Sequence, residues 1–227
     1  MTVQEKARWA LVLFLALVTS VSAVYRIVLV GTNTQSVTLP SMEASRPGAT
    51  VTANTRYNES PGWTYLHLFP GLTFMILGPL QFSSRIRAKR LNVHRWSGRI
   101  FLFVSITAAV VGMIMAAQPS TYIGANASAA AWFFGGLSVF CAVKAFYHVR
   151  RKEILLHREW MIRTFAIGLG VSTVRLVAVP LFALTDLPLQ EVMGISFWTG
   201  WGITMIGAEI WINLTRAPLH AAKASVY

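Results

Sequence analysis

Arg87–Arg99 reads RAKRLNVHRWSGR, and a similar stretch, RRKEILLHREWMIR, follows 63 residues later at Arg150–Arg163. In register, His94 matches His157, an arginine follows each histidine, and a tryptophan lies close behind. Each copy stands between two long apolar runs. The repeat predicts a duplicated unit of two membrane helices, joined by a short basic loop that ends in His-Arg at the start of the second helix.

The composition indicates a membrane protein. Of the 227 residues, 55% are apolar and 12% are charged, whereas about a quarter of residues are charged in soluble domains. The net charge of +12 does not indicate nucleic-acid binding, because the basic residues lie in loops between apolar runs rather than over one soluble face. The single cysteine, Cys141, excludes an intrachain disulfide and a Cys-based zinc or c-type haem motif. Any metal or haem would therefore be held mainly by the five histidines.

Six apolar runs are long enough to cross the hydrocarbon core, which takes about 20 helical residues. They cover residues 9–31, 64–83, 99–117, 129–147, 162–184 and 193–214. Most lysines and arginines fall in the two basic loops and at the two termini, and such residues gather on the cytoplasmic side. We expect an all-α polytopic protein of the inner cell membrane, with six transmembrane helices, both termini cytoplasmic, and a duplicated two-helix-hairpin (2+2) four-helix core.

This topology divides the chain into four segments. They are an N-terminal anchor helix, an external polar loop, the four-helix core of two repeated hairpins, and a sixth transmembrane helix with a cytoplasmic tail, at residues 1–31, 32–62, 63–184 and 185–227. A cleaved signal peptide is the alternative for the first segment, because Val21-Ser22-Ala23 fits a small-residue cleavage site. The uncleaved anchor is favoured, since apolar residues continue to Val30.

His94 and His157 form the first candidate site, near the inner membrane boundary. If the repeat produces a pseudo-twofold axis along the membrane normal, the two imidazoles face each other and supply both axial ligands of one b-type haem. The arginines expected around its propionates are Arg95, Arg99, Arg158 and Arg163. His148 is the alternative ligand, and three histidines together would equally suit zinc or copper. The other interpretation is an interfacial His-Arg pair that contacts head groups or caps a helix.

His67 and Arg175 form the second candidate site, toward the outer side. Arg175 lies about 21 Å into the fifth helix, and an arginine within the membrane is a functional candidate because it is costly to bury. We expect both side chains to line one pocket open to the outside, suited to an anionic or quinone-like ligand or to a second haem. The alternative is a structural pair of Arg175 with a helix-end carbonyl or with Asp186.

Glu209, on the sixth run, lies toward the inner side. Its expected partners there are Arg99, Arg163 and Lys144. We expect a buried salt bridge, and a proton-relay carboxylate is the alternative.

Several motifs together resemble a known family. They are His67-Leu-Phe-Pro-Gly, LGPLQF at residues 77–82, VHRWSGRI at 93–100, LHREWMIR at 156–163, and Arg175-Leu176. They resemble the bacterial predicted membrane proteins grouped as domain of unknown function 2306, over roughly residues 60–215. The resemblance implies an architecture and no activity. More loosely, the core is similar to the transmembrane cytochromes b that pass electrons from ascorbate or quinol, although those use a further histidine pair where this chain has only His67.

Three functions follow from these patterns. The first is a membrane oxidoreductase that holds haem b and exchanges electrons with a quinol, a quinone or a small reductant. The second is a non-enzymatic transporter or small-ligand binder that uses His67 and Arg175. The third is an accessory subunit whose basic loops contact anionic lipid, a membrane-complex partner or a second copy in a homodimer. The sequence contains no nucleophile elbow, Walker loop or dinucleotide fingerprint, so hydrolase and nucleotide-driven roles have no support.

Overall fold

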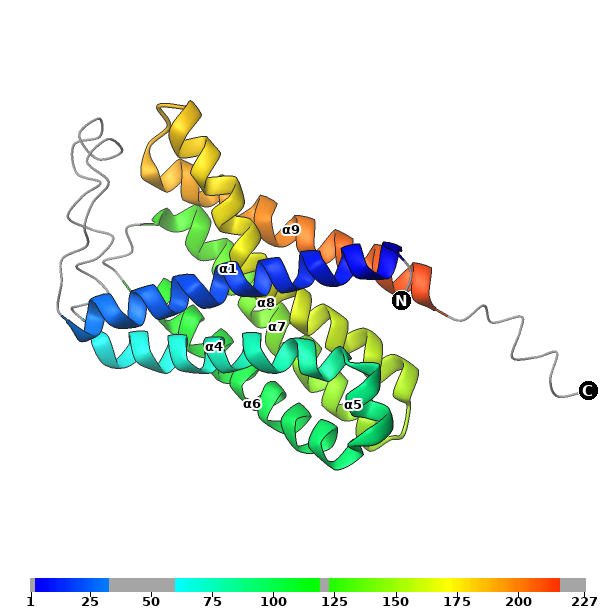
Figure 1. The fold of residues 1–227 in the computed structure, drawn as a ribbon. Coiled ribbons are helices and arrows are strands. Elements are labelled where there is room, and N and C mark those ends of the chain that lie inside the picture. Colours follow the sequence, from blue (N-terminus) through cyan, green and yellow to red (C-terminus); the bar gives the residue numbers. More distant parts are fainter. Residues whose placement is uncertain (1–2, 33–59, 119–122, 217–227) are drawn as a thin grey trace, which may run out of the picture.

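The computed structural model describes residues 3–32, 60–118 and 123–216, and this part of the chain is helical (Figure 1). Its helices are α1 (Val3–Gly31), α4 (Pro61–Phe82), α5 (Ser84–Lys89), α6 (Leu91–Ala116), α7 (Gly124–Arg150), α8 (Ile154–Leu184) and α9 (Leu189–Thr215). Most of the predicted external loop, at residues 32–62, and the end of the predicted tail lie outside the described residues. Each of the six predicted runs coincides with a long helix.

Four of the described helices are long and apolar enough to cross a membrane: α1 from Lys6 onward, α6, α7 and α8. The helices α4 and α9 are 22 and 27 residues long but are not among these four. Polar side chains within these two helices include His67 and Gln81 in α4 and Glu191 and Glu209 in α9. The chain is thus an all-helical membrane protein with several candidate spans.

The helices pack as successive neighbours. In chain order α4 packs against α6, α6 against α7 and α7 against α8, while α9 lies along α8 and α7. The helix α1 lies across α4 and α8 (Figure 1), and a hydrogen bond joins Thr19 of α1 to Ser172 of α8. The N-terminus, α5, the α7–α8 turn and the end of α9 all lie at one end of the bundle (Figure 1). We call this the basic end, because both basic loops are there.

The 63-residue spacing of the repeat recurs in the helix starts. The helix α6 begins at Leu91 and α8 begins at Ile154. In each, the backbone N–H of the fourth residue, His94 or His157, closes the first helical turn on the carbonyl of the residue before the helix, at 3.1 and 2.9 Å. Both helices begin about eight residues before the predicted runs, because the polar His-Arg stretches contain no helix breaker and continue the helix beyond its apolar part.

The half of the bundle nearer the basic end is tightly packed. Phe101 packs with Phe74 and Phe165, with ring centroids 4.4 and 6.2 Å away. Gly78 makes room for this cluster, since a Cβ there would lie 2.0 Å from the Phe165 ring. The outer surface of the bundle is apolar, with side chains such as Phe103 71% exposed, as expected for helices that face lipid.

Candidate functional site

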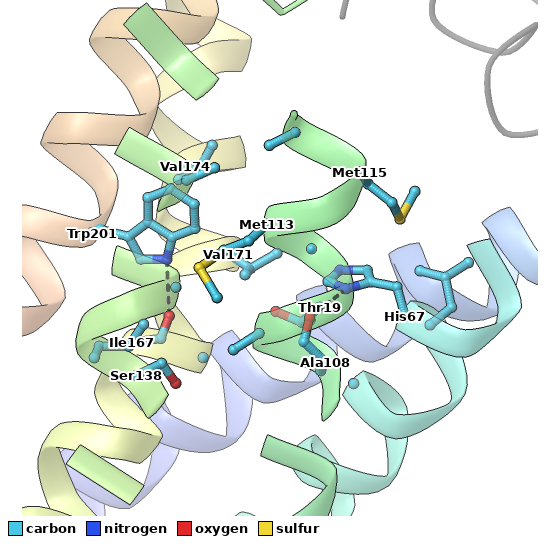
Figure 2. A pocket seen from close by; sticks show the side chains of 18 of the residues that line it. Thr19, His67, Ala108, Met113, Met115, Ser138, Ile167, Val171, Val174 and Trp201 are labelled. Carbon is cyan, nitrogen blue, oxygen red and sulfur yellow. Dashed lines mark hydrogen bonds between the residues drawn. The ribbon is translucent and has the colours of Figure 1, made fainter. Parts of the chain in front are cut away.

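A cavity of about 420 Å³ occupies the half of the bundle away from the basic end. All six long helices contribute to its wall (Figure 2). The wall is mostly apolar and its polar or charged members are Thr19, Arg26, His67, Ser105, Ser138 and Arg175. Four of the eight methionines also line it, namely Met75, Met113, Met115 and Met193. A space of this size lies within the range of small-molecule sites, about 300–1,000 Å³.

The His67 imidazole reaches from α4 into this cavity with a defined orientation (Figure 2). Its Nδ1 lies 2.9 Å from the backbone oxygen of Ala108 in α6. A carbonyl oxygen only accepts, so Nδ1 carries the hydrogen, and in the neutral ring Nε2 holds a lone pair. Among the described residues Nε2 has no hydrogen-bond partner. Gly112 leaves space for the ring, because a Cβ there would lie 3.1 Å from His67 Cε1.

Arg175 belongs to the same wall as His67, and the two interact electrostatically. One of its hydrogen bonds runs from Nη1 to the oxygen of Val171, one turn earlier in α8, at 2.8 Å. Trp201 of α9 closes another side of the cavity and donates from Nε1 to the oxygen of Ile167 at 3.0 Å (Figure 2). Neither Trp201 nor Arg26 was expected from the sequence, because contacts between helices far apart in the chain leave no local pattern.

The structure brings His94 and His157 near enough to interact electrostatically at the basic end. His157 donates from Nδ1 to the oxygen of Ala145 at 2.8 Å, which leaves its Nε2 as the nitrogen available to a ligand. The Nδ1 of His94 is buried and has no hydrogen-bond partner within the described residues. His148 is directed elsewhere, since its Nδ1 lies 2.5 Å from Glu153 Oε2.

The four arginines expected around haem propionates have separate surroundings. Arg163 forms a bidentate pair with Glu209 at 2.6 and 2.9 Å. Arg158 donates to the side chain of Thr215 at 2.7 Å. The other two are exposed: Arg95, and Arg99, whose guanidinium stacks on Trp96 at 4.8 Å. Of the three partners expected for Glu209, the structure selects Arg163.

No three histidine, cysteine or acidic side chains lie together as a metal site in the described ranges. The three-histidine zinc or copper cluster is therefore not assembled there. The wall of the cavity described above includes neither His94 nor His157. The haem b assignment stays a prediction.

Charged groups at the basic end stabilise one another. The hydrogen bond from His148, supported by Arg151, holds the pKa of the Glu153 carboxyl below its usual range. Glu159 of α8 accepts two hydrogen bonds from Arg216, each 2.8 Å, and these raise the pKa of the Arg216 guanidinium. The first interaction stabilises the α7–α8 turn, and the second holds the end of α9 against α8.

Comparison with known proteins gives one match. The family model described as "Predicted membrane protein (DUF2306)" matches residues 64–212, from α4 to near the end of α9. No curated protein and no solved structure matches the chain. The looser similarity to transmembrane cytochromes b therefore has no counterpart among these comparisons.

Proposed function

Because the chain belongs to this family of predicted membrane proteins, which brings no assigned activity, we propose its function from the cavity. The protein binds a small lipophilic molecule with a hydrogen-bonding head group, of the quinone class, among its membrane helices. The observation that carries this proposal is the His67 imidazole, whose Nδ1 is held by Ala108 while Nε2 is left to a ligand in a largely apolar cavity.

The proposed topology has six spans, with the basic end in the cytoplasm. The helices α4 and α9 contribute to the cavity wall like the four clearly apolar helices, and both also expose large apolar side chains, such as Ile76 at 58% and Ile206 at 63%. Loops rich in lysine and arginine favour the cytoplasmic side of the inner membrane. On this topology the cavity lies in the outer half of the bilayer.

The lining suits a flat, redox-active ring. A quinone carbonyl accepts hydrogen bonds, for which Arg175 supplies donors, whereas a quinol hydroxyl donates to the lone pair on His67 Nε2. The apolar wall takes the face of the ring and the start of its tail. Methionine side chains adapt to irregular shapes and make favourable contacts with aromatic faces, which suits the four that line this cavity.

Trp201 provides a direct assay, because its indole forms part of the cavity wall. A short-chain quinone titrated into the detergent-purified protein should quench tryptophan fluorescence, and Trp201→Phe should remove most of the saturable signal. His67→Leu or Arg175→Leu should weaken binding at least about tenfold, since each loses a hydrogen bond to the head group. Arg99→Leu, an exposed site outside the cavity wall, is the control. Unchanged affinity in both cavity variants, or no saturable quenching, would contradict the proposal.

Haem binding between α6 and α8 remains the second candidate, because His94 and His157 lie near each other and each retains a ring nitrogen without a partner in the described part of the chain. A reduced-minus-oxidised absorption spectrum of the purified protein tests it. We expect His94→Ala or His157→Ala to abolish a b-type signal, and His67→Ala to retain it. A full signal in both basic-end variants would refute this ligand assignment.

A further inference from the structure

Two arginines from different repeats lie near each other at the basic end. Arg87 of α5 and Arg158 of α8 lie close enough to repel each other electrostatically. Both guanidinium groups donate to neutral oxygens: Arg87 Nη1 to the oxygen of Gln81 at 3.2 Å, and Arg158 Nη2 to Thr215 Oγ1 at 2.7 Å. A guanidinium has five N–H donors, so most donors of this pair remain for a ligand.

The carboxylates of the basic end are engaged with other bases. Glu153 is held by His148 and Arg151, and Glu209 by Arg163. Glu159 attracts its neighbour Arg158, but both of its oxygens accept hydrogen bonds from Arg216. In the part of the chain that the structure describes, no carboxylate forms an ion pair with Arg87 or Arg158. Among the described residues, the charges of Arg87 and Arg158 are therefore offset by the nearby Glu159 but by no direct ion pair.

His94 joins this cluster from α6. Its imidazole interacts electrostatically with Arg87 and with Arg95, the next residue along the helix. Its buried Nδ1 has no hydrogen-bond partner among the described residues. A buried polar atom without a partner is unusual in a folded protein and calls for an unseen one. We call four residues the basic-end cluster: Arg87, His94, Arg95 and Arg158. The cluster combines excess positive charge with a buried nitrogen that has no hydrogen-bond partner among the described residues.

We propose that the basic-end cluster binds the phosphate of an anionic phospholipid. Arginine pairs recognise phosphate oxygens through charge-assisted, often bidentate, hydrogen bonds. Basic pockets between membrane helices bind phospholipid head groups in this way. Large apolar side chains stand exposed beside the cluster, including Val93 at 48% and Leu155 at 71%, and offer a surface for the acyl chains. The inference is independent of the ligand in the cavity.

The test measures phosphatidylglycerol retained by the full-length, detergent-purified protein, by native mass spectrometry over a lipid titration. The double variant Arg87→Gln/Arg158→Gln should lose affinity about 100-fold, because two charge-assisted hydrogen bonds disappear. The matched control is Arg85→Gln/Arg150→Gln, which removes the same charge from α5 and the end of α7 at exposed sites. The control should lose less than about tenfold, since neither Arg85 nor Arg150 is among the charges that act on His94 or Arg158.

Three outcomes would overturn the proposal. Equal losses in the two double variants would mean that only general surface charge attracts the lipid. Inorganic phosphate that binds as tightly as the lipid, measured by calorimetry on the same protein, would assign the cluster to a free anion. A haem whose spectrum shifts in Arg158→Gln would assign the guanidinium to a propionate. Thermal unfolding of both double variants is the folding control. Midpoints close to that of the unchanged protein show that the lipid affinities of folded proteins are being compared.

Discussion

Two glycines of α4, one in each half of the bundle, have opposite surroundings. Near the basic end, Gly78 lies beneath the Phe165 ring, and a cluster of phenylalanines fills the space between the helices. In the other half, Gly71 has no atom within 4 Å of the place where its Cβ would be, and it borders the cavity. A glycine in a membrane helix therefore allows either close packing or an open site. The difference lies in whether a large side chain on a facing helix fills the space.

The sharpest test of this comparison replaces one glycine in each half of the same helix. Gly78→Ala should lower the free energy of unfolding by about 1–3 kcal/mol, because the new methyl group overlaps the Phe165 ring. Gly71→Ala should leave stability unchanged or raise it by up to about 1 kcal/mol, since alanine favours helix and meets open space. Unfolding in detergent with a chemical denaturant measures both. Equal losses for the two variants would show that the halves do not differ in packing.

Filling the cavity should separate binding from stability. Gly71→Leu places a larger side chain into the space that borders His67, so we expect about a tenfold weaker affinity for the quinone probe. The midpoint of thermal unfolding should change little. Fluorescence quenching and a thermal melt on the same preparation provide both readings. Loss of stability without loss of affinity would mean that position 71 faces a packed interface instead.

The ion pairs near the basic end should contribute less than the aromatic packing. In a double-mutant cycle with Arg163→Gln and Glu209→Gln, we expect a coupling free energy of about 0.5–1 kcal/mol, because Glu209 remains 44% exposed and solvent weakens the pair. The same denaturant experiment measures it. Zero coupling would show that the pair between α8 and α9 is dispensable.

The smallest expected effect is a pH dependence at the α7–α8 turn. The pKa of Glu153 is held below its ordinary value of 4.5, so its charged form stabilises the folded protein above that pH. This contribution should start to decline about one unit higher, near pH 5.5, and disappear as pH falls through the folded-state pKa. Glu153→Gln should flatten the acid side of the thermal-midpoint curve and leave the neutral side little changed. An identical acid decline in both proteins would refute the role of Glu153.

The sequence predicted the elements better than their contacts. Apolar runs and basic loops located six long helices, and the 63-residue spacing of the His-Arg repeat recurs in the starts of α6 and α8, although both helices begin before the predicted runs. Which arginine pairs with Glu209 depends on how α9 is rotated about its own axis relative to α8. No local sequence pattern encodes that rotation, so Arg163 could not be singled out. The contributions of Arg26 and the four methionines to the cavity were missed for the same reason. Only His67 and Arg175 stood out, because polar side chains are rare within apolar runs.

The length of α8 sets how the protein meets its membrane. At 1.5 Å per residue its 31 residues extend about 46 Å, against a hydrocarbon core of about 30 Å. Even a tilt of about 40°, at the upper end of what membrane helices adopt, leaves several ångströms of helix outside the core. The first turn of α8, which carries His157, then projects into the head-group layer. A helix longer than the hydrocarbon core can adapt to thicker or thinner bilayers by changing its tilt. Hydrophobic mismatch would therefore change the tilt of α8 before it disturbed the packing of α8 against the other helices.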